Sequence, residues 1–533
     1  MPPCFSWCRR SHACDCSPLV VFLARAKVSH YRQYPPGTEY VYSYFESRGG
    51  KFDEVCFFGL QYFIKRYLVG QVVTRQTIDE AKEIMDNHMG PDHFNLEGWE
   101  HILKEHGGKL PVSIKAVPEG MVVPTKNVLF TMVNTDPKCF WLTNYLETLL
   151  VEVWYPMTVA TNSRAQKKLL QASLARTGGS DAGLKFMLHD FGYRGVSSVE
   201  SAAIGGAGHL VNFWGTDTVA ALVCAKKFYN TPAGDGVQVP LPGVPGVMLP
   251  VAGLSIPAAE HSTITSWGRE NEAAAFKNML TQYPTGLVAI VSDSYDVFNA
   301  CTNLWGGELK ELVKSRGCFE NRIIIRPDSG DPPVIVPKLL GLLGEAFKED
   351  VSTTSTGHKV LPPYIRMIQG DGISYESLGD ILAAMEKAGW AAENLAFGSG
   401  GALLQKLNRD TQKCAFKCSE ITKAGGETFE VYKDPITDKG KQSKKGKLTL
   451  ERQPNGSLKT ITEGKGNPSN DVLVEVFRDG EICIEWSFAE IRERAELPPL
   501  VIGKGGKTVD PSGVTPAVKE EAAPGGAGCC EVM

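Results

Sequence analysis

The sequence contains no apolar run long enough to cross a membrane and no excess of basic residues. None of its uninterrupted apolar stretches approaches the ~18 residues that a membrane-spanning helix needs. The formal net charge is −4 at pH 7, so no overall positive charge attracts nucleic acid or an anionic membrane surface. A non-enzymatic nucleic-acid binder is therefore disfavoured, and any phosphate must be bound by arginines and lysines placed locally.

Cysteine pairs with the spacing of a disulfide framework are also absent. Most of the 14 cysteines stand singly among apolar residues, which is typical of a reducing compartment, so we expect a cytoplasmic protein. The first residues do hold a cluster, which consists of Cys4, Cys8, His12, Cys14 and Cys16. Its spacing matches no zinc-binding pattern, and we interpret residues 1–26 as an atypical leader.

The middle of the chain repeats a simple pattern, in which an apolar, strand-like run ends in a charged or glycine-rich cluster. Successive clusters lie about 25 to 45 residues apart, the length of one strand and one returning helix. This pattern predicts a parallel α/β barrel, in which the loops after the strands converge on one face. The seven runs are 186–190, 210–217, 256–261, 288–293, 323–328, 365–371 and 395–401.

The segments on either side of this repeat mix strand and helix patterns, as in an α+β domain. Before it, the pattern predicts strands at 39–45 and 120–133 and amphipathic helices at 57–69, 79–88 and 94–106. After it, strand patterns return at 428–432, 472–477 and 482–486. We therefore expect the C-terminal part to fold back on the N-terminal part. The predicted organisation is a leader (1–26), the N-terminal part of an α+β domain (27–180), a catalytic barrel (181–410), its C-terminal part (411–502) and a disordered tail (503–533).

Eight strings of residues resemble the nicotinamide phosphoribosyltransferases, type II phosphoribosyltransferases of the nicotinate/nicotinamide phosphoribosyltransferase family. The resemblance extends from about Lys27 to Leu497, and the strings are KVSHYRQYPPGT, HDFGYRGVSS, GTDTVA, IPAAEHSTIT, SDSYD, IIRPDSG, IQGDG and FGSGGALLQKL. It implies an α/β fold, an incomplete parallel barrel with an α+β domain formed by the N- and C-terminal segments. It also implies a homodimer with active sites at the subunit boundary. The implied reaction makes nicotinamide mononucleotide and pyrophosphate from nicotinamide and phosphoribosyl pyrophosphate, in NAD salvage.

Arginines and glycines at the strand ends suit the phosphates of such a substrate. Guanidinium groups pair two oxygens at once, and glycines let backbone N–H groups approach a phosphate. The resemblance assigns these roles to Arg194, Arg326, Arg409, Gly400 and Gly401. The alternative for the glycine loop is an ordinary turn.

The resemblance also implies a ribose and metal end of the site. Gly370 and Asp371 match the residues that hold the ribose hydroxyls. Asp328, directly after Pro327, resembles an essential carboxylate that orients ribose and Mg²⁺-pyrophosphate, and its alternative role is to cap the following helix. Loss of pyrophosphate leaves positive charge on the sugar, which nearby carboxylates stabilise.

His261 matches the family histidine that ATP phosphorylates. A lone histidine is most often a core or surface residue, but a neutral imidazole is nucleophilic near physiological pH. Asp293 resembles the carboxylate that orients this ring. ATP is therefore expected as a coupled phosphoryl donor that stimulates synthesis.

The pyridine base needs a flat apolar slot and one discriminating polar group. Phe191 resembles the aromatic residue that stacks on the ring. Asp217 resembles the acceptor for the carboxamide NH₂, and a carboxylate there would repel nicotinate. Its alternative role is to cap the helix expected at 218–227. The family tyrosine that completes the stacking has no counterpart near Ala26, so either the stacking is one-sided or residues 1–26 are a mispredicted start; we favour the second.

Two further features lie in the C-terminal part. By resemblance, Arg48, Lys417, Lys433 and Lys441 reach phosphates across the dimer, although a solvated basic face is the usual interpretation of such a lysine run. The chain ends Cys-Cys-Glu-Val-Met, which fits a prenylation signal at Cys530 with a poor aliphatic position. Membrane association is expected only if Cys530 is prenylated.

Two other functions compete with this hypothesis. A nicotinate phosphoribosyltransferase would share the fold, but Asp217 argues against it. A non-catalytic binding or signalling protein could keep the fold without turnover, but the intact His261, Asp328 and Arg326 argue against that.

Overall fold

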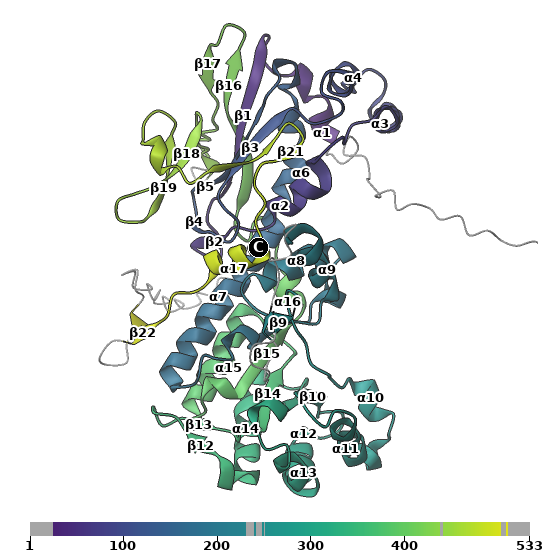
Figure 1. The fold of residues 1–533 in the computed structure, drawn as a ribbon, viewed down its shortest axis with the longest axis vertical. Coiled ribbons are helices and arrows are strands. Elements are labelled where there is room, and N and C mark those ends of the chain that lie inside the picture. The colour runs from purple at the N-terminus through teal and green to yellow at the C-terminus, as the bar shows by residue number, and fades with distance from the viewer. Residues whose placement is uncertain are drawn as a thin grey trace, which may run out of the picture.

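The computed structural model describes residues 25–230, 239–240, 248–249, 251–437, 441–502 and 508–509. The predicted leader and tail lie outside these ranges except at 25–26 and 508–509, and so do the cysteine cluster at 4–16 and Cys530. Figure 1 shows an upper body built on a long antiparallel sheet and a lower body built on parallel strands. No helix in the described ranges is both long and apolar enough to serve as a membrane span.

The lower body is a curled sheet of parallel strands, which forms where the sequence repeat predicted it. Nearly every residue of these strands is buried, as expected when helices cover a parallel sheet. In sheet order the strands are β10 (Val288–Val291), β11 (Ile323–Arg326), β14 (Ile365–Gln369), β15 (Leu395–Ser399), β6 (Leu188–Asp190) and β7 (Gly215–Thr216).

The strand expected at 256–261 does not form. This segment makes only isolated parallel bridges, from Leu254 to Gly215 of β7 and from Ala258 to Ala289 of β10. Pro257 has no N–H group to donate, so a regular ladder cannot continue through it. The segment nevertheless joins the two edges of the sheet, and His261 begins a helix instead of ending a strand.

Helices surround the parallel sheet and bury their apolar faces against it. Leu339, Leu340 and Leu343 of α14 lie in the same core as the strand residues, and so does Phe276, whose ring stacks on Trp305 at 4.5 Å. The helices from the long connecting helix onward are α7 (Trp154–Thr177), α8 (Val199–Leu210), α9 (Val219–Tyr229), α10 (His261–Thr265), α11 (Glu272–Gln282), α12 (Val297–Asn299), the π-helix Ala300–Glu308, α13 (Lys310–Lys314), α14 (Pro332–Ala346), α15 (Tyr375–Lys387) and α16 (Gly401–Leu404).

The upper body is an antiparallel sheet to which both halves of the chain contribute. The central strand β1 pairs with β16 on one side and with β5 on the other. The predicted fold class, an incomplete parallel barrel with an α+β domain formed by N- and C-terminal segments, is therefore confirmed. In order the strands are β17 (Thr428–Glu430), β16 (Cys414–Lys423), β1 (Thr38–Ser47), β5 (Val128–Asn134), β3 (Val112–Ala116), β20 (Val474–Arg478) and β21 (Glu481–Ile482).

Short helices and strand pairs complete the described chain. The helices are α1 (Arg25–Val28), α2 (Leu60–Phe63), the π-helix Ile64–Leu68, α3 (Arg75–Met89), α4 (Leu96–Glu105), α5 (Leu142–Tyr145), α6 (Glu147–Val151) and α17 (Phe488–Ala495). The pairs are β2 (Glu54–Cys56) with β4 (Val122–Pro124), β8 (Val239–Pro240) with β9 (Met248–Leu249), β12 (Ser352–Thr353) with β13 (Lys359–Val360), β18 (Leu448–Arg452) with β19 (Leu458–Thr462), and β22 (Val501–Ile502) with β23 (Thr508–Val509).

In the strand-like run expected at 210–217, only Gly215–Thr216 forms a strand, and Leu210 is the last residue of α8. Three expected elements of the α+β domain also differ from the structure. The helix expected at 57–69 begins at Leu60, because Gly59 has a left-handed φ of 108° that ends the preceding extended segment. The single strand expected at 120–133 is split into β4 and β5 by a turn at Lys126, whose φ is 67°. The last strand, expected at 482–486, is limited to Glu481–Ile482.

The two bodies are joined by α17 as well as by α7. Arg492 of α17 donates hydrogen bonds to the carbonyl groups of Leu210 and Phe213 in the barrel body, at 2.8 and 3.4 Å. Arg494 donates to the carbonyl of Glu119, which precedes β4. The C-terminal helix therefore holds the barrel edge against the antiparallel sheet.

Candidate active site

Asp293 lies at the centre of a polar cluster at the carboxyl ends of β10 and β11. Its Oδ1 lies 3.1 Å from Nε2 of His261, the first residue of α10. Its Oδ2 accepts a hydrogen bond of 2.9 Å from the backbone N–H of Asp328. The structure therefore brings together three of the residues that the sequence predicted from separate strand ends.

Asp293 is held in its ionised form. Burial alone would raise its pKa, but hydrogen bonds from Ser329, the Asp328 N–H and His261 outweigh burial and lower it. The side chain of Asp293 is 3% exposed, whereas that of His261 is 45% exposed. The second ring nitrogen of His261, Nδ1, has no hydrogen-bond partner among the described residues. A buried carboxylate thus orients an imidazole whose other nitrogen is free to react.

Arg326 and Asp328 extend this cluster. Arg326 is the last residue of β11, and its guanidinium lies 3.2 Å from Asp328 Oδ2 and 3.3 Å from Glu260 Oε2. Burial raises the pKa of Asp328, against the opposing effect of Arg326. The proposed capping role of Asp328 is wrong, because the helix α14 begins after Asp331. Its carboxylate is therefore available to a ligand.

Phe191 lies directly after β6 and forms the apolar floor beside this cluster. Phe191 packs against the small buried cluster formed by Ala289, Ile324 and Ile368. A Cβ atom at residue 398 would overlap the ring, and one at residue 370 would lie 3.3 Å from it and 3.1 Å from Asp328 Oδ1. Glycine at both positions therefore lets an aromatic surface and a carboxylate adjoin each other.

Asp217 ends the neighbouring strand segment on the other side of Phe191. Its side chain is exposed, and Oδ1 accepts a hydrogen bond from the Ser255 hydroxyl. The alternative capping role is wrong here too, because Thr218 is the residue at the N-cap of α9 and no side chain caps that helix. Burial lowers the pKa of His189, which interacts with Asp217, so this imidazole is neutral at pH 7.

The predicted phosphate loops also meet. Arg194 lies in a turn whose next residue, Gly195, is so close to the glycine loop that a Cβ there would lie 3.3 Å from Gly401. Arg194 is exposed, and a Cβ on Gly401 would meet no atom within 4 Å. The loop that follows β15 therefore presents open backbone close to the turn that carries Arg194. Gly400 stands at the N-cap of the short helix α16.

The remaining ribose and phosphate candidates lie at the rim. Gly370 and the exposed Asp371 follow β14 directly, and the buried Pro327 separates Arg326 from Asp328. Carboxylate oxygens of Asp328 and Asp371 are the type of donor that Mg²⁺ prefers. The residues present thus fit a magnesium-bound diphosphate at this rim.

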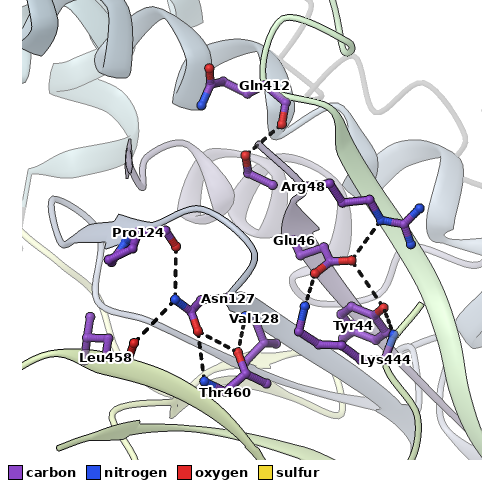
Figure 2. Close-up of polar contacts among 11 residues, drawn as sticks. Tyr44, Glu46, Arg48, Pro124, Asn127, Val128, Gln412, Lys444, Leu458 and Thr460 are labelled. Carbon is purple, nitrogen blue, oxygen red and sulfur yellow. Dashed lines mark hydrogen bonds and ion pairs between the residues drawn. The ribbon is translucent and has the colours of Figure 1, made fainter. Parts of the chain in front are cut away.

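The predicted cross-dimer residues lie in the other body. Arg48 follows β1, and its Nε contacts Glu46 Oε1 at 2.9 Å, while the ammonium group of Lys444 pairs with the second oxygen of Glu46 (Figure 2). Nη2 of Arg48 is buried and has no hydrogen-bond partner among the described residues. Burial lowers the pKa of Lys417, and Arg48 and Arg409 nearby lower it further. Arg48, Lys417 and Arg409 are therefore gathered into one cationic cluster.

This cationic cluster is carried by β1, β16 and the segment before β16, not by the parallel strands of the barrel. Figure 1 shows β1 and β16 in the upper body and β10 and β14 in the lower body. Lys433 and Lys441 lie beyond β17; the Lys433 N–H donates a hydrogen bond to the Ser443 hydroxyl at 2.8 Å. The structure therefore assembles the predicted site residues in two groups.

Sequence reasoning missed three polar neighbours of the site, namely Ser255, Ser329 and His189. Ser329 lies next to Asp328 and helps to keep Asp293 ionised. Ser255 directly precedes the run 256–261, and His189 lies next to Asp190 at the end of the run 186–190. These positions were the only sequence features that could have identified them as neighbours of the site. Their residue types are too common for a single sequence to single them out.

Comparisons with known proteins agree with this geometry. Residues 186–481 match the nicotinate phosphoribosyltransferase (NAPRTase) family, and residues 20–114 match the N-terminal domain of nicotinamide phosphoribosyltransferase. A nicotinamide phosphoribosyltransferase of Xanthomonas campestris pv. campestris is 50% identical over 482 residues, which cover 89% of this chain and 97% of the relative. One from Acinetobacter baylyi is 35% identical over 503 residues, covering 88% of this chain and 95% of the relative.

A solved structure shares the fold at low sequence identity. The nicotinate-nucleotide pyrophosphorylase of Pyrococcus furiosus aligns with a TM-score of 0.54 at 14% identity, covering 91% of this chain and 97% of that one. At this identity the likeness concerns the fold alone.

Proposed function

This chain belongs to the nicotinate phosphoribosyltransferase (NAPRTase) family, and we propose that it joins nicotinamide to phosphoribosyl pyrophosphate, giving nicotinamide mononucleotide and pyrophosphate for NAD salvage. It is a phosphoribosyltransferase. The observation that carries the proposal is the position of Gly370, which lies against both the Phe191 ring and the Asp328 carboxylate. A slot for a flat base thus adjoins a carboxylate suited to the sugar.

The base end explains the preference for nicotinamide over nicotinate. The pyridine ring lies on Phe191, and its carboxamide NH₂ donates to the exposed carboxylate of Asp217. A nicotinate carboxylate would place two negative charges together, which disfavours it. Ser255 supports this role because its hydroxyl orients Asp217.

The sugar and phosphate end stabilises the charges that develop in the reaction. The bond between the anomeric carbon and pyrophosphate lengthens as the pyridine nitrogen approaches, so the sugar becomes positive and the leaving group negative. Asp328 stabilises the sugar, while Arg326 and Arg194 bind phosphate oxygens. Asp328 and Asp371 would hold Mg²⁺ through the pyrophosphate, and the ion would neutralise the leaving group.

For stimulation by ATP, we propose that His261 accepts the γ-phosphoryl group. Because Nε2 faces Asp293, Nδ1 is the nitrogen that attacks phosphorus while the bond to the ADP oxygen breaks. The ionised Asp293 accepts the Nε2–H and so keeps the lone pair on Nδ1.

We further propose a homodimer and a cytoplasmic location. The dimer proposal draws on the cationic cluster of Arg48, Lys417 and Arg409, which the barrel strands do not carry and which would supply phosphate contacts to a partner's site. Lys433 and Lys441 would join it. The location draws on the described cysteines that are free, which is typical of a reducing compartment: Cys56, Cys139, Cys224, Cys301, Cys318, Cys414, Cys418 and Cys483.

One assay tests the substrate, the reaction and the ATP effect together. Purified protein is incubated with phosphoribosyl pyrophosphate and Mg²⁺ and with either pyridine, with and without ATP, and the mononucleotide is quantified by chromatography. Nicotinamide mononucleotide should form faster than nicotinate mononucleotide, and ATP should increase the rate. Preference for nicotinate would overturn the substrate proposal, and no turnover with either base would favour a non-catalytic binding protein.

A further inference from the structure

A second group of polar side chains lies in the α+β domain, away from the barrel mouth. It consists of His101, His106, Asp136 and Cys139, and their ligand-type atoms all lie within 4.8 Å of one another. Nε2 of each histidine lies 2.7 Å from the same atom, Asp136 Oδ2. None of these residues contributes to the proposed transfer reaction.

Two separate segments hold these side chains in place. His101 lies on α4, and His106 is the residue at which that helix ends. Asp136 is the N-cap residue of the short 3₁₀ turn Pro137–Cys139 that follows β5, and Cys139 is its last residue. Asp136 caps this turn, because its Oδ1 accepts the Lys138 N–H at 2.8 Å. Its other oxygen, Oδ2, is therefore left to face the two imidazoles.

Hydrogen bonding alone accounts for only part of the cluster. The two imidazoles lower the pKa of Asp136 to about 2 although burial opposes them, so this carboxylate is ionised. The thiol of Cys139 is buried and has no hydrogen-bond partner among the described residues. Burial and the charge of Asp136 raise the pKa of that thiol to about 12. The neighbouring groups give this buried thiol no stabilising hydrogen bond, whereas a bound cation would attract both the thiolate and the carboxylate.

We propose that His101, His106, Asp136 and Cys139 bind one Zn²⁺ ion as a structural site. Two imidazoles, a carboxylate and a thiolate form a complete four-ligand set of the type that zinc prefers. Metal–ligand distances of about 2.0 to 2.3 Å place tetrahedral ligand atoms about 3.3 to 3.7 Å apart. The two imidazoles, now 2.7 Å from Asp136 Oδ2, would therefore move slightly away from it.

Proton transfer accompanies binding. An imidazole must present the lone pair of Nε2 to the ion, so any proton on that nitrogen moves to Nδ1 or to solvent. The thiol loses its proton to solvent as the Zn–S bond forms. Binding should therefore release at least about one proton per ion.

The ion would join the end of α4 to the start of the next helical segment. Trp99 of α4 packs edge-on against Trp141, with ring centroids 4.8 Å apart, and against Tyr145 at 5.0 Å. The proposed site lies at one end of this aromatic contact and would prevent the two segments from separating. It therefore predicts a gain in stability and no change in catalysis.

Metal binding is tested on the full-length protein after treatment with a chelator. The protein is titrated with Zn²⁺ while proton release is followed with a pH indicator, and separately with Co²⁺ while the absorption spectrum is recorded. We expect about one ion per chain, and with Co²⁺ a thiolate-to-metal charge-transfer band together with intense visible bands of tetrahedral coordination. Zinc at 100 times its Kd should raise the Tm by about 2 to 3 °C.

Matched variants separate this site from adventitious binding. Cys139→Ser should abolish the charge-transfer band, and His101→Gln and His106→Gln should each weaken binding by at least about tenfold. Cys483→Ser and His358→Gln, which alter the same residue types outside the cluster, should bind as the wild type does. Should Cys139→Ser fail to fold, the two histidine variants, whose side chains are partly exposed, still decide the question. Absence of stoichiometric binding, or binding unchanged in the histidine variants, would overturn the proposal.

Discussion

The barrel mouth and the α+β domain each contain histidine paired with aspartate, but the two clusters differ in which atoms they leave free. At the barrel mouth, one carboxylate orients one half-exposed imidazole, and Nδ1 of His261 remains open. In the α+β domain, two imidazoles converge on a single oxygen of Asp136, with a buried thiol beside them.

This difference indicates why the same residue types serve different purposes. An open atom can attack or bind a substrate, whereas a closed ligand set can only hold an ion or a fold together, as the distinction between catalytic and structural metal sites also shows. Both aspartates have a lowered pKa, because hydrogen bonds to each outweigh its burial. Ionisation alone therefore does not distinguish a reactive cluster from a structural one.

The largest effect on kcat/KM is expected from a substitution of Asp328, which belongs to the cluster at the barrel mouth. Asp328→Ala removes the carboxylate that is proposed to stabilise the sugar, so kcat/KM should fall by about 10³-fold. The matched change in the closed cluster, Asp136→Ala, should leave kcat/KM of the folded protein within about twofold, because it touches no substrate. Initial-rate kinetics on both variants, with circular dichroism to verify folding, provide the measurement. Equal losses in the two variants would contradict the assignment.

A second expected effect concerns the base end of the open site. Asp217→Ser removes the negative charge, so the ratio of kcat/KM for nicotinamide over nicotinate should fall by about 10²-fold. Competition between the two bases for phosphoribosyl pyrophosphate measures this ratio. Asp181→Ser, at an exposed aspartate before β6, is the control and should leave the ratio unchanged. An unaltered ratio in Asp217→Ser would remove Asp217 from base selection.

The free nitrogen of His261 leads to a third prediction. His261→Ala removes the proposed phosphoryl acceptor, so the ratio of rates with and without ATP should fall to about 1. His101→Gln, which changes an imidazole of the closed cluster, should keep the wild-type ratio. Radiolabelled γ-phosphoryl transfer to the protein should disappear in the first variant and persist in the second. Full retention of ATP stimulation in His261→Ala refutes the role of this histidine.

The two clusters also differ in how far the sequence alone could predict them. His261, Asp293 and Asp328 end consecutive units of a regular repeat, and parallel strands bring such ends to one face. His101 and His106 are five positions apart, a spacing that does not place them on one face of a continuous helix. Only the end of α4 at Glu105 turns His106 toward Asp136.

Local chemistry explains the other differences from the sequence-based expectations. The segment 256–261 has the apolar pattern of a strand, but Pro257 interrupts its ladder, so His261 begins a helix. The capping roles considered for Asp217 and Asp328 failed because Thr218 and Asp331 occupy the cap positions. Such shifts of one to three residues depend on backbone geometry that residue types alone do not determine.

The smallest effect is expected from Glu260, whose charge influences the pKa of Asp328 in the barrel-mouth cluster. Glu260 raises the pKa of Asp328 and also pairs with Arg326. Glu260→Gln removes that negative charge, and Asp328 then remains as the anionic partner of Arg326 within this cluster. The pKa of Asp328 should therefore fall. The carboxylate then stays ionised to lower pH, and the acid limb of the kcat/KM profile should move toward lower pH. Because the Glu260 side chain is 60% exposed, solvent screens its charge, and the shift should be a few tenths of a pH unit.

The matched control for this change is Glu345→Gln, at an exposed glutamate on α14 that pairs with Lys348. Its pH profile should coincide with that of the wild type. A shift of the acid limb toward higher pH in Glu260→Gln would mean that Glu260 acts mainly by positioning Arg326, because a displaced guanidinium would no longer favour the ionised form of Asp328. The direction of the shift therefore separates the charge of Glu260 from its role as a partner of Arg326.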